Sequence, residues 1–279
     1  MTTIALAVPH AAWLPDRAKL MSALRPQLTA PCPPGGPGPD WYQEFTEREH
    51  WEQWFPRMLD WAARCGGGRA SHLLTLQDDV ELAPNFWPTL RAILAAWPDE
   101  VVSLAATHSL AREVARQGRR SYRTPRLVGW GWAMPIGLVR ELLKWMAAGN
   151  LAHFRQECPL DGEDTLTMAF LHTHQIQPRS PVPTIVDHLH VASTNAGFDD
   201  HTHRRAVVTW RGYEPADMAE PTWWQTTCTD LPHDEWRLCW WCGCRPENMR
   251  SAVTGAMLCK PCLAVMMLSA LGLRAEAGP

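Results

Sequence analysis

The chain has 279 residues, of which 46% are hydrophobic and 20% are charged, so it can bury a full α/β core in one large domain or in a large and a small one. It contains no run of about 18 apolar residues, which excludes a transmembrane helix. Its start lacks the basic and apolar regions of a signal peptide. The formal net charge of −3 gives no overall attraction to nucleic acid or anionic membranes. We therefore expect a soluble cytoplasmic protein, located in the host cytoplasm if the chain is viral.

Short apolar runs alternate with amphipathic stretches along the first two thirds of the chain. The predicted strands are residues 4–8, 71–76, 101–104, 127–134 and 183–190, and the predicted helices are residues 15–28, 46–63, 85–96, 136–148 and 165–172. Residues 30–39 are rich in proline and glycine and predict an exposed loop. This alternation is typical of an α/β domain with a mostly parallel sheet flanked by helices.

An acidic turn, Gln77-Asp78-Asp79, directly follows the predicted strand 71–76. Carboxylates at the C-terminal end of a strand lie where open α/β sheets bind ligands. Two adjacent carboxylates need a positive partner, and a divalent cation is a strong one. A helix cap or a tight turn also explains such a pair, so the turn alone leaves both interpretations open.

A dense basic stretch follows the predicted strand 101–104. It contains Arg112, Arg116, Arg119, Arg120, Arg123 and Arg126. Two interpretations are open, a solvated helix face with its loop or a patch that contacts phosphates.

Nine cysteines in a chain without a leader argue for metal ligands or buried thiols rather than disulfides. The pairs Cys239-x2-Cys242 and Cys259-x2-Cys262 are separated by sixteen residues, a spacing that predicts one tetrahedral structural zinc. Cys244 is an alternative ligand to Cys242. Four thiolates leave no open coordination position, so we do not expect a catalytic zinc. The arrangement resembles a treble-clef or zinc-ribbon finger.

Four segments, taken in order, resemble GT-A glycosyltransferases, in particular bacterial and phage members. They are residues 4–8 with the following helix, residues 72–80 with Phe86, residues 129–135, and residues 161–164 with residues 183–188. Gln77 stands where the first acid of the family's DxD-type motif often stands. The resemblance covers about residues 1–195 and implies a Rossmann-like fold and a metal-dependent, hexosyltransferase-like enzyme that uses a nucleotide sugar.

The resemblance also implies a donor site around the acidic turn. Its expected donor-binding residues are His10, Gln77, Asp78 and Asp79. Asp79, with His188 or His190, is expected to hold a Mn²⁺ or Mg²⁺ ion that bridges the donor's diphosphate and stabilises the leaving group. Gln77 leaves this ion with one fewer anionic ligand than the usual motif supplies.

The predicted catalytic base lies in a second acidic segment, Asp161-Gly162-Glu163-Asp164. The resemblance assigns the base of an inverting reaction to the pair Glu163-Asp164, with Asp164 preferred and Asp161 in reserve. A carboxylate there takes the proton from the acceptor hydroxyl as it attacks the anomeric carbon. The alternative is that Glu163 and Asp164 only stabilise a helix N-terminus through the macrodipole.

We expect three parts, a catalytic domain over residues 1–195, a segment over residues 196–234 that wraps it, and a zinc-finger-like module over residues 235–279. A finger joined to a transferase suggests a macromolecular acceptor, such as 5-hydroxymethylated bases in phage DNA. The residues expected to contact its phosphates are Arg116, Arg119 and Arg120. Two alternatives remain, transfer to a cell-surface or protein glycan, and a non-catalytic zinc-dependent nucleic-acid-binding protein.

Overall fold

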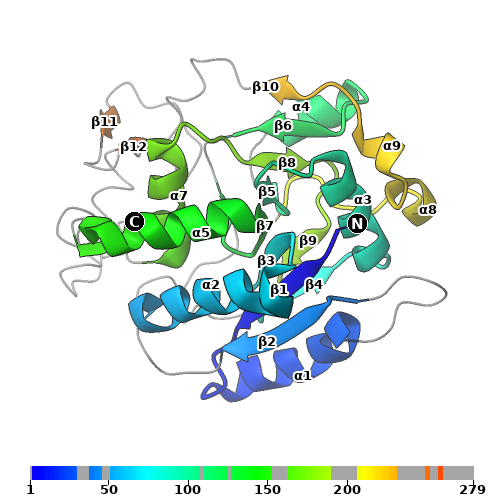
Figure 1. Cartoon of the computed structure of the whole chain (residues 1–279). Coiled ribbons are helices and arrows are strands. Elements are labelled where there is room, and N and C mark those ends of the chain that lie inside the picture. The colour runs from blue at the N-terminus through cyan, green and yellow to red at the C-terminus, as the bar shows by residue number, and fades with distance from the viewer. Residues whose placement is uncertain are drawn as a thin grey trace, which may run out of the picture.

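The structure is a computed structural model that describes residues 2–29, 38–45, 51–106, 110–124, 127–152, 162–189, 206–230, 249–251 and 257–259. Within these ranges, eight strands form one sheet in the order β10-β6-β8-β5-β7-β3-β1-β2 (Figure 1). The strands are β1 (Ile4–Pro9), β2 (Trp41–Phe45), β3 (His72–Leu76), β5 (Val102–Ser103), β6 (Ser121–Arg123), β7 (Gly131–Pro135), β8 (Arg179–Pro181) and β10 (Thr229–Asp230).

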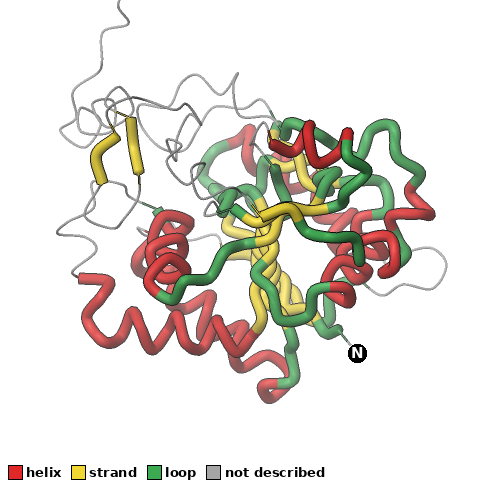
Figure 2. Tube along the Cα trace, turned by 90° about the horizontal axis from the view of Figure 1, so that it is seen from above, coloured by secondary structure: helices red, strands yellow, loops and turns green. Residues whose placement is uncertain are grey.

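Helices cover both faces of this sheet, and Figure 2 shows the strands lying between the two layers of helices. They are α1 (Pro15–Thr29), α2 (Trp51–Gly68), α3 (Phe86–Ala96), α4 (Leu110–Arg116), α5 (Ile136–Trp145), the π-helical turn η1 (Met146–Asn150), α7 (Glu163–Thr173), α8 (Pro215–Met218) and α9 (Pro221–Trp224). No helix in the described part of the chain is long and apolar enough to cross a membrane.

The sheet with helices on both faces confirms the predicted α/β fold.

The sheet is mixed rather than uniformly parallel. β1 runs parallel to β3, as expected, and also to β2, whereas β7 runs antiparallel to its neighbours β3 and β5. β7 begins at the edge of the sheet where β3 ends. A hydrogen bond of 3.0 Å marks this position, in which the backbone N–H of Gln77, just after β3, donates to Trp130 O, just before β7. The chain therefore enters β7 from the carboxyl edge of β3 and must run in the opposite direction.

The two faces of β1 bury different side chains. Ile4, Leu6 and Val8 belong to the core with α1 and α3, whereas Ala5 and Ala7 belong to the core with α2, α5 and α7. Successive side chains of a strand point to opposite faces, so this pattern follows directly from the sequence. The small alanine side chains leave room for the aromatic residues of α2 on their face.

The regular part of α2 ends where the sequence predicts, at Cys65-Gly66-Gly67. Cys65 has an extended ψ of 131°, and Gly66 and Gly67 have positive φ angles of 57° and 68°. A β-carbon at Gly66 would collide with the indole of Trp41 on β2. Glycine is therefore required at Gly66 both for its backbone angle and for the approach of this ring.

Residues 206–230 are built into the same core. Trp224 of α9 is fully buried, and its ring lies 5.8 Å from that of Trp97 at the end of α3. The indole N–H of Trp224 donates to Met218 O at 2.8 Å, so the buried polar group is satisfied. β10 then pairs with β6 at the edge of the sheet.

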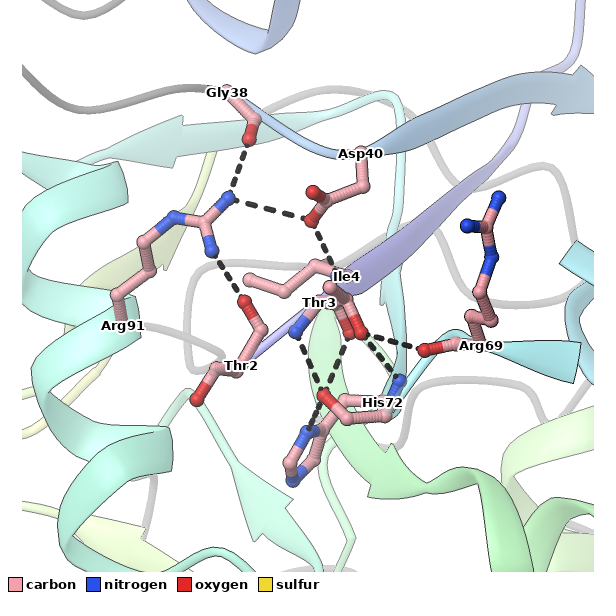
Figure 3. A network of polar contacts seen from close by, with 9 residues as sticks. Thr2, Thr3, Ile4, Gly38, Asp40, Arg69, His72 and Arg91 are labelled. Carbon is pink, nitrogen blue, oxygen red and sulfur yellow. Dashed lines mark hydrogen bonds and ion pairs between the residues drawn. The ribbon is translucent and has the colours of Figure 1, made fainter. Parts of the chain in front are cut away.

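A polar network holds the amino end of the sheet together (Figure 3). Arg91 of α3 donates to Thr2 O and to Gly38 O, each at 2.7 Å. Asp40 accepts the backbone N–H of Ile4 at 2.7 Å. These bonds fix the starts of β1 and β2 relative to α3, at the opposite end of the sheet from the acidic turn.

His72 starts β3 within the same network. Its Nε2 donates to Pro98 O at 3.0 Å, and its Nδ1 lies 2.9 Å from Ser71 Oγ. Burial lowers the pKa of His72 below its usual value, although the Pro98 carbonyl opposes the shift. Burial therefore favours the neutral form of this imidazole, whose two contacts are structural.

Candidate functional site

The acidic turn lies at the carboxyl edge of the sheet, after β3 and before the short strand β4 (Val80–Leu82). β4 pairs antiparallel with β9 (Val186–His188), and Val80 lies opposite His188. Asp79 O also accepts the backbone N–H of Leu189 at 2.8 Å. This register fixes His188 beside the turn.

Arg17, in the first turn of α1, neutralises both carboxylates of the turn. Its Nη1 donates to Asp78 Oδ1 at 2.8 Å and also forms an ion pair with Asp79 Oδ2. The other oxygen of Asp78 accepts the backbone N–H of Ala11 at 3.0 Å. Arg17, Asp78 and Asp79 are only 6%, 5% and 2% exposed, so these charges are paired in a site with little access to water.

His188 completes the pairing of Asp79. Its Nε2 lies 3.0 Å from Asp79 Oδ2, and its ring packs on that of Trp130 with 4.9 Å between centroids. Burial by itself would raise the pKa of Asp79, but the hydrogen bond and charge of His188, together with Arg17, outweigh it and lower that pKa. For Asp78, burial outweighs Arg17 and the Ala11 amide and raises the pKa.

Several buried polar atoms in this cluster have no hydrogen-bond partner among the described residues. They include both ring nitrogens of His10, which is 8% exposed, Oδ1 of Asp79, and Nε of Arg17, whose Nη1 pairs with both aspartates. The nearest acid to His10 is Glu44, whose Oε2 lies 3.8 Å from Nδ1, beyond hydrogen-bond range. Buried polar atoms that stay unsatisfied cost free energy, so such atoms in a cluster call for an explanation.

Glu44 on β2 extends the cluster toward a cavity. It accepts two hydrogen bonds from Arg25 of α1, at 2.6 and 2.8 Å, and another from the hydroxyl of Tyr42. The Arg25 guanidinium, opposed by partial burial and helped by Tyr42, lowers the pKa of Glu44. A cavity of about 350 Å³ opens between the end of β2 and α2, with Glu44, Phe45 and Trp61 in its lining.

Asp164 lies at the start of α7, against the segment that leads into β7. Its Oδ1 accepts the backbone N–H of Thr165 at 2.7 Å. A β-carbon at Gly129 would come within 3.1 Å of its Oδ2. Gly129 precedes Trp130, which packs on His188, so the second acidic segment adjoins the segment that contacts the acidic turn.

The structure thus brings together several residues that the sequence predicts as a site. His10, Asp78, Asp79 and His188 gather around Arg17, and Gln77 joins them through its backbone. Asp161, His190, Cys239, Cys242 and Cys262 lie outside the described residues. Cys259 ends the hairpin of β11 (Met249–Ser251) and β12 (Met257–Cys259), of which only the backbone is described.

Arg17, Glu44 and Trp130 also belong to the cluster, although the sequence did not predict them there. A signal for Arg17 existed, because a basic side chain in the first turn of a helix opposes the macrodipole. Such a locally unfavourable position indicates a partner elsewhere in the fold. No comparable signal existed for Glu44, since β2 itself was not predicted.

The predicted phosphate-contacting arginines lie on another part of the sheet. Arg116 pairs with Glu113 on α4 at 2.6 Å, and the guanidinium of Arg120 stacks 4.1 Å above the ring of Trp223. Arg119 lies three residues after the last residue of α4, and its backbone N–H donates to Val114 O. This region leads into β6, four strands from β3 and hence about 19 Å away at about 4.8 Å per strand.

The acidic turn has the ligand types of a divalent-cation site, but its residues fit one poorly in this arrangement. Three of the four carboxylate oxygens bond Arg17, His188 or the Ala11 amide, and Asp79 Oδ1 is the exception. Across the described residues, no three side chains of His, Cys, Asp and Glu converge as metal ligands. The manganese or magnesium ion and the zinc ion both stay predictions.

No protein-family model and no curated protein matches the chain. The resemblance to glycosyltransferases therefore depends on the residues and segments named above.

Proposed function

We propose that the chain is a GT-A-type glycosyltransferase that takes its sugar from a nucleoside-diphosphate donor. The observation that carries the proposal is the buried cluster at the carboxyl edge of β1 and β3, in which atoms of His10 and Asp79 have no hydrogen-bond partner within the described part of the chain. Open α/β sheets bind ligands at this edge. Sugar and ribose hydroxyls both donate and accept hydrogen bonds, so they match an unsatisfied carboxylate oxygen and an imidazole.

In this proposal the acidic turn binds the donor and the second acidic segment supplies the base. Asp79, whose pKa is lowered, accepts a hydrogen bond from a donor hydroxyl, and His10 contacts the same molecule. Asp164 takes the proton of the acceptor hydroxyl as its oxygen attacks the anomeric carbon. A new carbon–oxygen bond forms there, and the bond to the diphosphate breaks with its electrons leaving on the nucleotide.

For the acceptor we propose 5-hydroxymethylated DNA, on the strength of the predicted zinc module. The paired state of Arg116 and the stacking of Arg120 on Trp223 limit what these two side chains offer to phosphates. A glycan acceptor is therefore tested alongside DNA.

The experiment incubates the full chain with labelled nucleotide sugars and either hydroxymethylated DNA or a glycan array. We expect transfer by the wild type, and Asp164→Asn should lower it by about 100-fold or more while donor affinity changes by less than about twofold. Asp217→Asn, at an exposed aspartate of α8, is the matched control and should transfer normally. Failure of every donor to bind or react would refute the proposal, and DNA binding without turnover would favour the non-catalytic alternative.

A further inference from the structure

The acidic turn contains its own counter-cation. One nitrogen of Arg17 bonds both Asp78 and Asp79, and all three side chains are more than nine-tenths buried. Arginine stays protonated at any ordinary pH, so this positive charge is permanent. It lies between the two carboxylates that a metal ion would otherwise have to neutralise.

His188 also occupies a position that a metal ion would need. It bonds Oδ2 of Asp79, the oxygen that also pairs with Arg17, so the lone pairs of Oδ2 face two protein donors. A divalent cation at the turn would lie beside a buried guanidinium of like charge. It would also have to replace hydrogen bonds that the protein already makes, and dehydrating such a cation is itself costly.

The fold holds Arg17 in this place. The loop from β1 into α1 is tied to the turn through the Ala11 amide, which donates to Asp78 at 3.0 Å. Arg17 stands in the first turn of α1, whose Met21, Leu24 and Leu28 are buried against the sheet. Withdrawal of the guanidinium would leave two adjacent carboxylates buried without their cation.

We propose that Arg17 takes the place of a divalent cation at the acidic turn, so that the site binds its ligand without a metal. The claim that the site binds a nucleotide-sugar donor without a metal rests on the proposed function. The claim that the turn does not bind a divalent cation is independent of it, because it depends only on Arg17, Asp78 and Asp79.

The first test measures Mn²⁺ binding by the electron paramagnetic resonance of the free ion, in metal-free buffer with zinc supplied at about one equivalent. We expect no binding at the turn by the wild type at about 1 mM Mn²⁺. Arg17→Met keeps the length of the side chain and removes its charge. This variant should gain a Mn²⁺ site whose dissociation constant is at least about tenfold below the roughly 1 mM at which the wild type shows no binding. Adding Asp79→Asn to that variant should abolish the new site.

Wild-type binding of Mn²⁺ tighter than about 100 µM, lost in Asp79→Asn, would overturn the proposal. The wild-type measurement decides even where Arg17→Met does not fold, which circular dichroism detects. Arg17→Lys is the conservative control, because it keeps a cation in place and should not gain the site.

The second test measures donor binding by the wild type by calorimetry, with and without Mn²⁺, using a panel of uridine, guanosine and adenosine diphosphate sugars. We expect affinities that agree within about twofold. A strict Mn²⁺ requirement would overturn the role of Arg17 and leave the proposed function intact. Absence of donor binding under both conditions would refute the proposed function, while the Mn²⁺ titration still decides the role of Arg17.

Discussion

Replacement of Arg17 by methionine tests how far the buried charges of the acidic turn depend on one another. The variant keeps most of the side-chain volume of Arg17 but leaves Asp78 and Asp79, which are 5% and 2% exposed, without their shared cation. Removing one partner of a buried pair costs about 3–5 kcal/mol, because the remaining charge stays buried. His188 still donates to Asp79, so we expect a loss near the lower limit, about 3 kcal/mol in the free energy of unfolding.

The pH dependence of this loss has a definite sign. Burial already raises the pKa of Asp78, and Arg17 is the main group that opposes the rise. Without Arg17 the folded state should bind a proton more readily than the unfolded state, whose aspartate titrates near its ordinary value. Falling pH then stabilises the variant relative to the wild type, so the loss should be smaller at pH 5 than at pH 8.

The assay is urea unfolding followed by tryptophan fluorescence at both pH values. Arg25→Met is the matched control, since Arg25 lies on the same helix and pairs with Glu44, but its side chain is 47% exposed. Exposed ion pairs contribute little to stability, so this control should cost much less. Equal losses for the two variants, or a loss that does not shrink at pH 5, would refute the reasoning.

Three further predictions concern other parts of the chain. Wild-type stability should fall as pH drops below about 6.5, because the pKa of His72 is lower in the folded state and the unfolded state therefore takes up a proton first. If His72→Gln leaves the slope of unfolding free energy against pH unchanged, this prediction is wrong. Gly66→Ala should destabilise the fold by more than about 1 kcal/mol, because Gly66 has a φ of 57° and its added β-carbon would collide with Trp41. At Gly67 an added β-carbon meets no atom within 4 Å, so Gly67→Ala should lose only the contribution of the backbone angle. Thermal unfolding compares the two variants. Cys259→Ser should reduce bound zinc from about one ion per chain to none, measured by atomic emission, and a full zinc content in this variant would contradict the predicted finger.

Long periodic elements could be predicted from the sequence, and short ones could not. The helices α1, α3 and α5 begin at or within a residue of the predicted positions, because apolar residues recur along them at helical spacing. β6 and β8 have three residues each and carry polar side chains, so they show no strand pattern of their own. Their extended conformation depends on pairing with neighbours that lie far away in the chain.

The direction of β7 shows the same limit. Residues 127–134 read as a strand in the sequence, and residues 131–135 form one. An apolar pattern reports burial and not orientation, so it does not distinguish a parallel from an antiparallel neighbour. Only the path of the chain, which brings Trp130 to the carboxyl edge of β3, decides that β7 runs antiparallel.

For the candidate site, local patterns were enough to predict that an acidic turn follows a buried strand in an α/β domain. The groups that neutralise this turn could not be predicted, because they come from distant parts of the chain. Arg17 is 61 residues away from Asp78, and His188 reaches Asp79 only through the register of β4 with β9. Burial must pair every charge, but the packing of distant elements selects the partner, and here it selects a guanidinium.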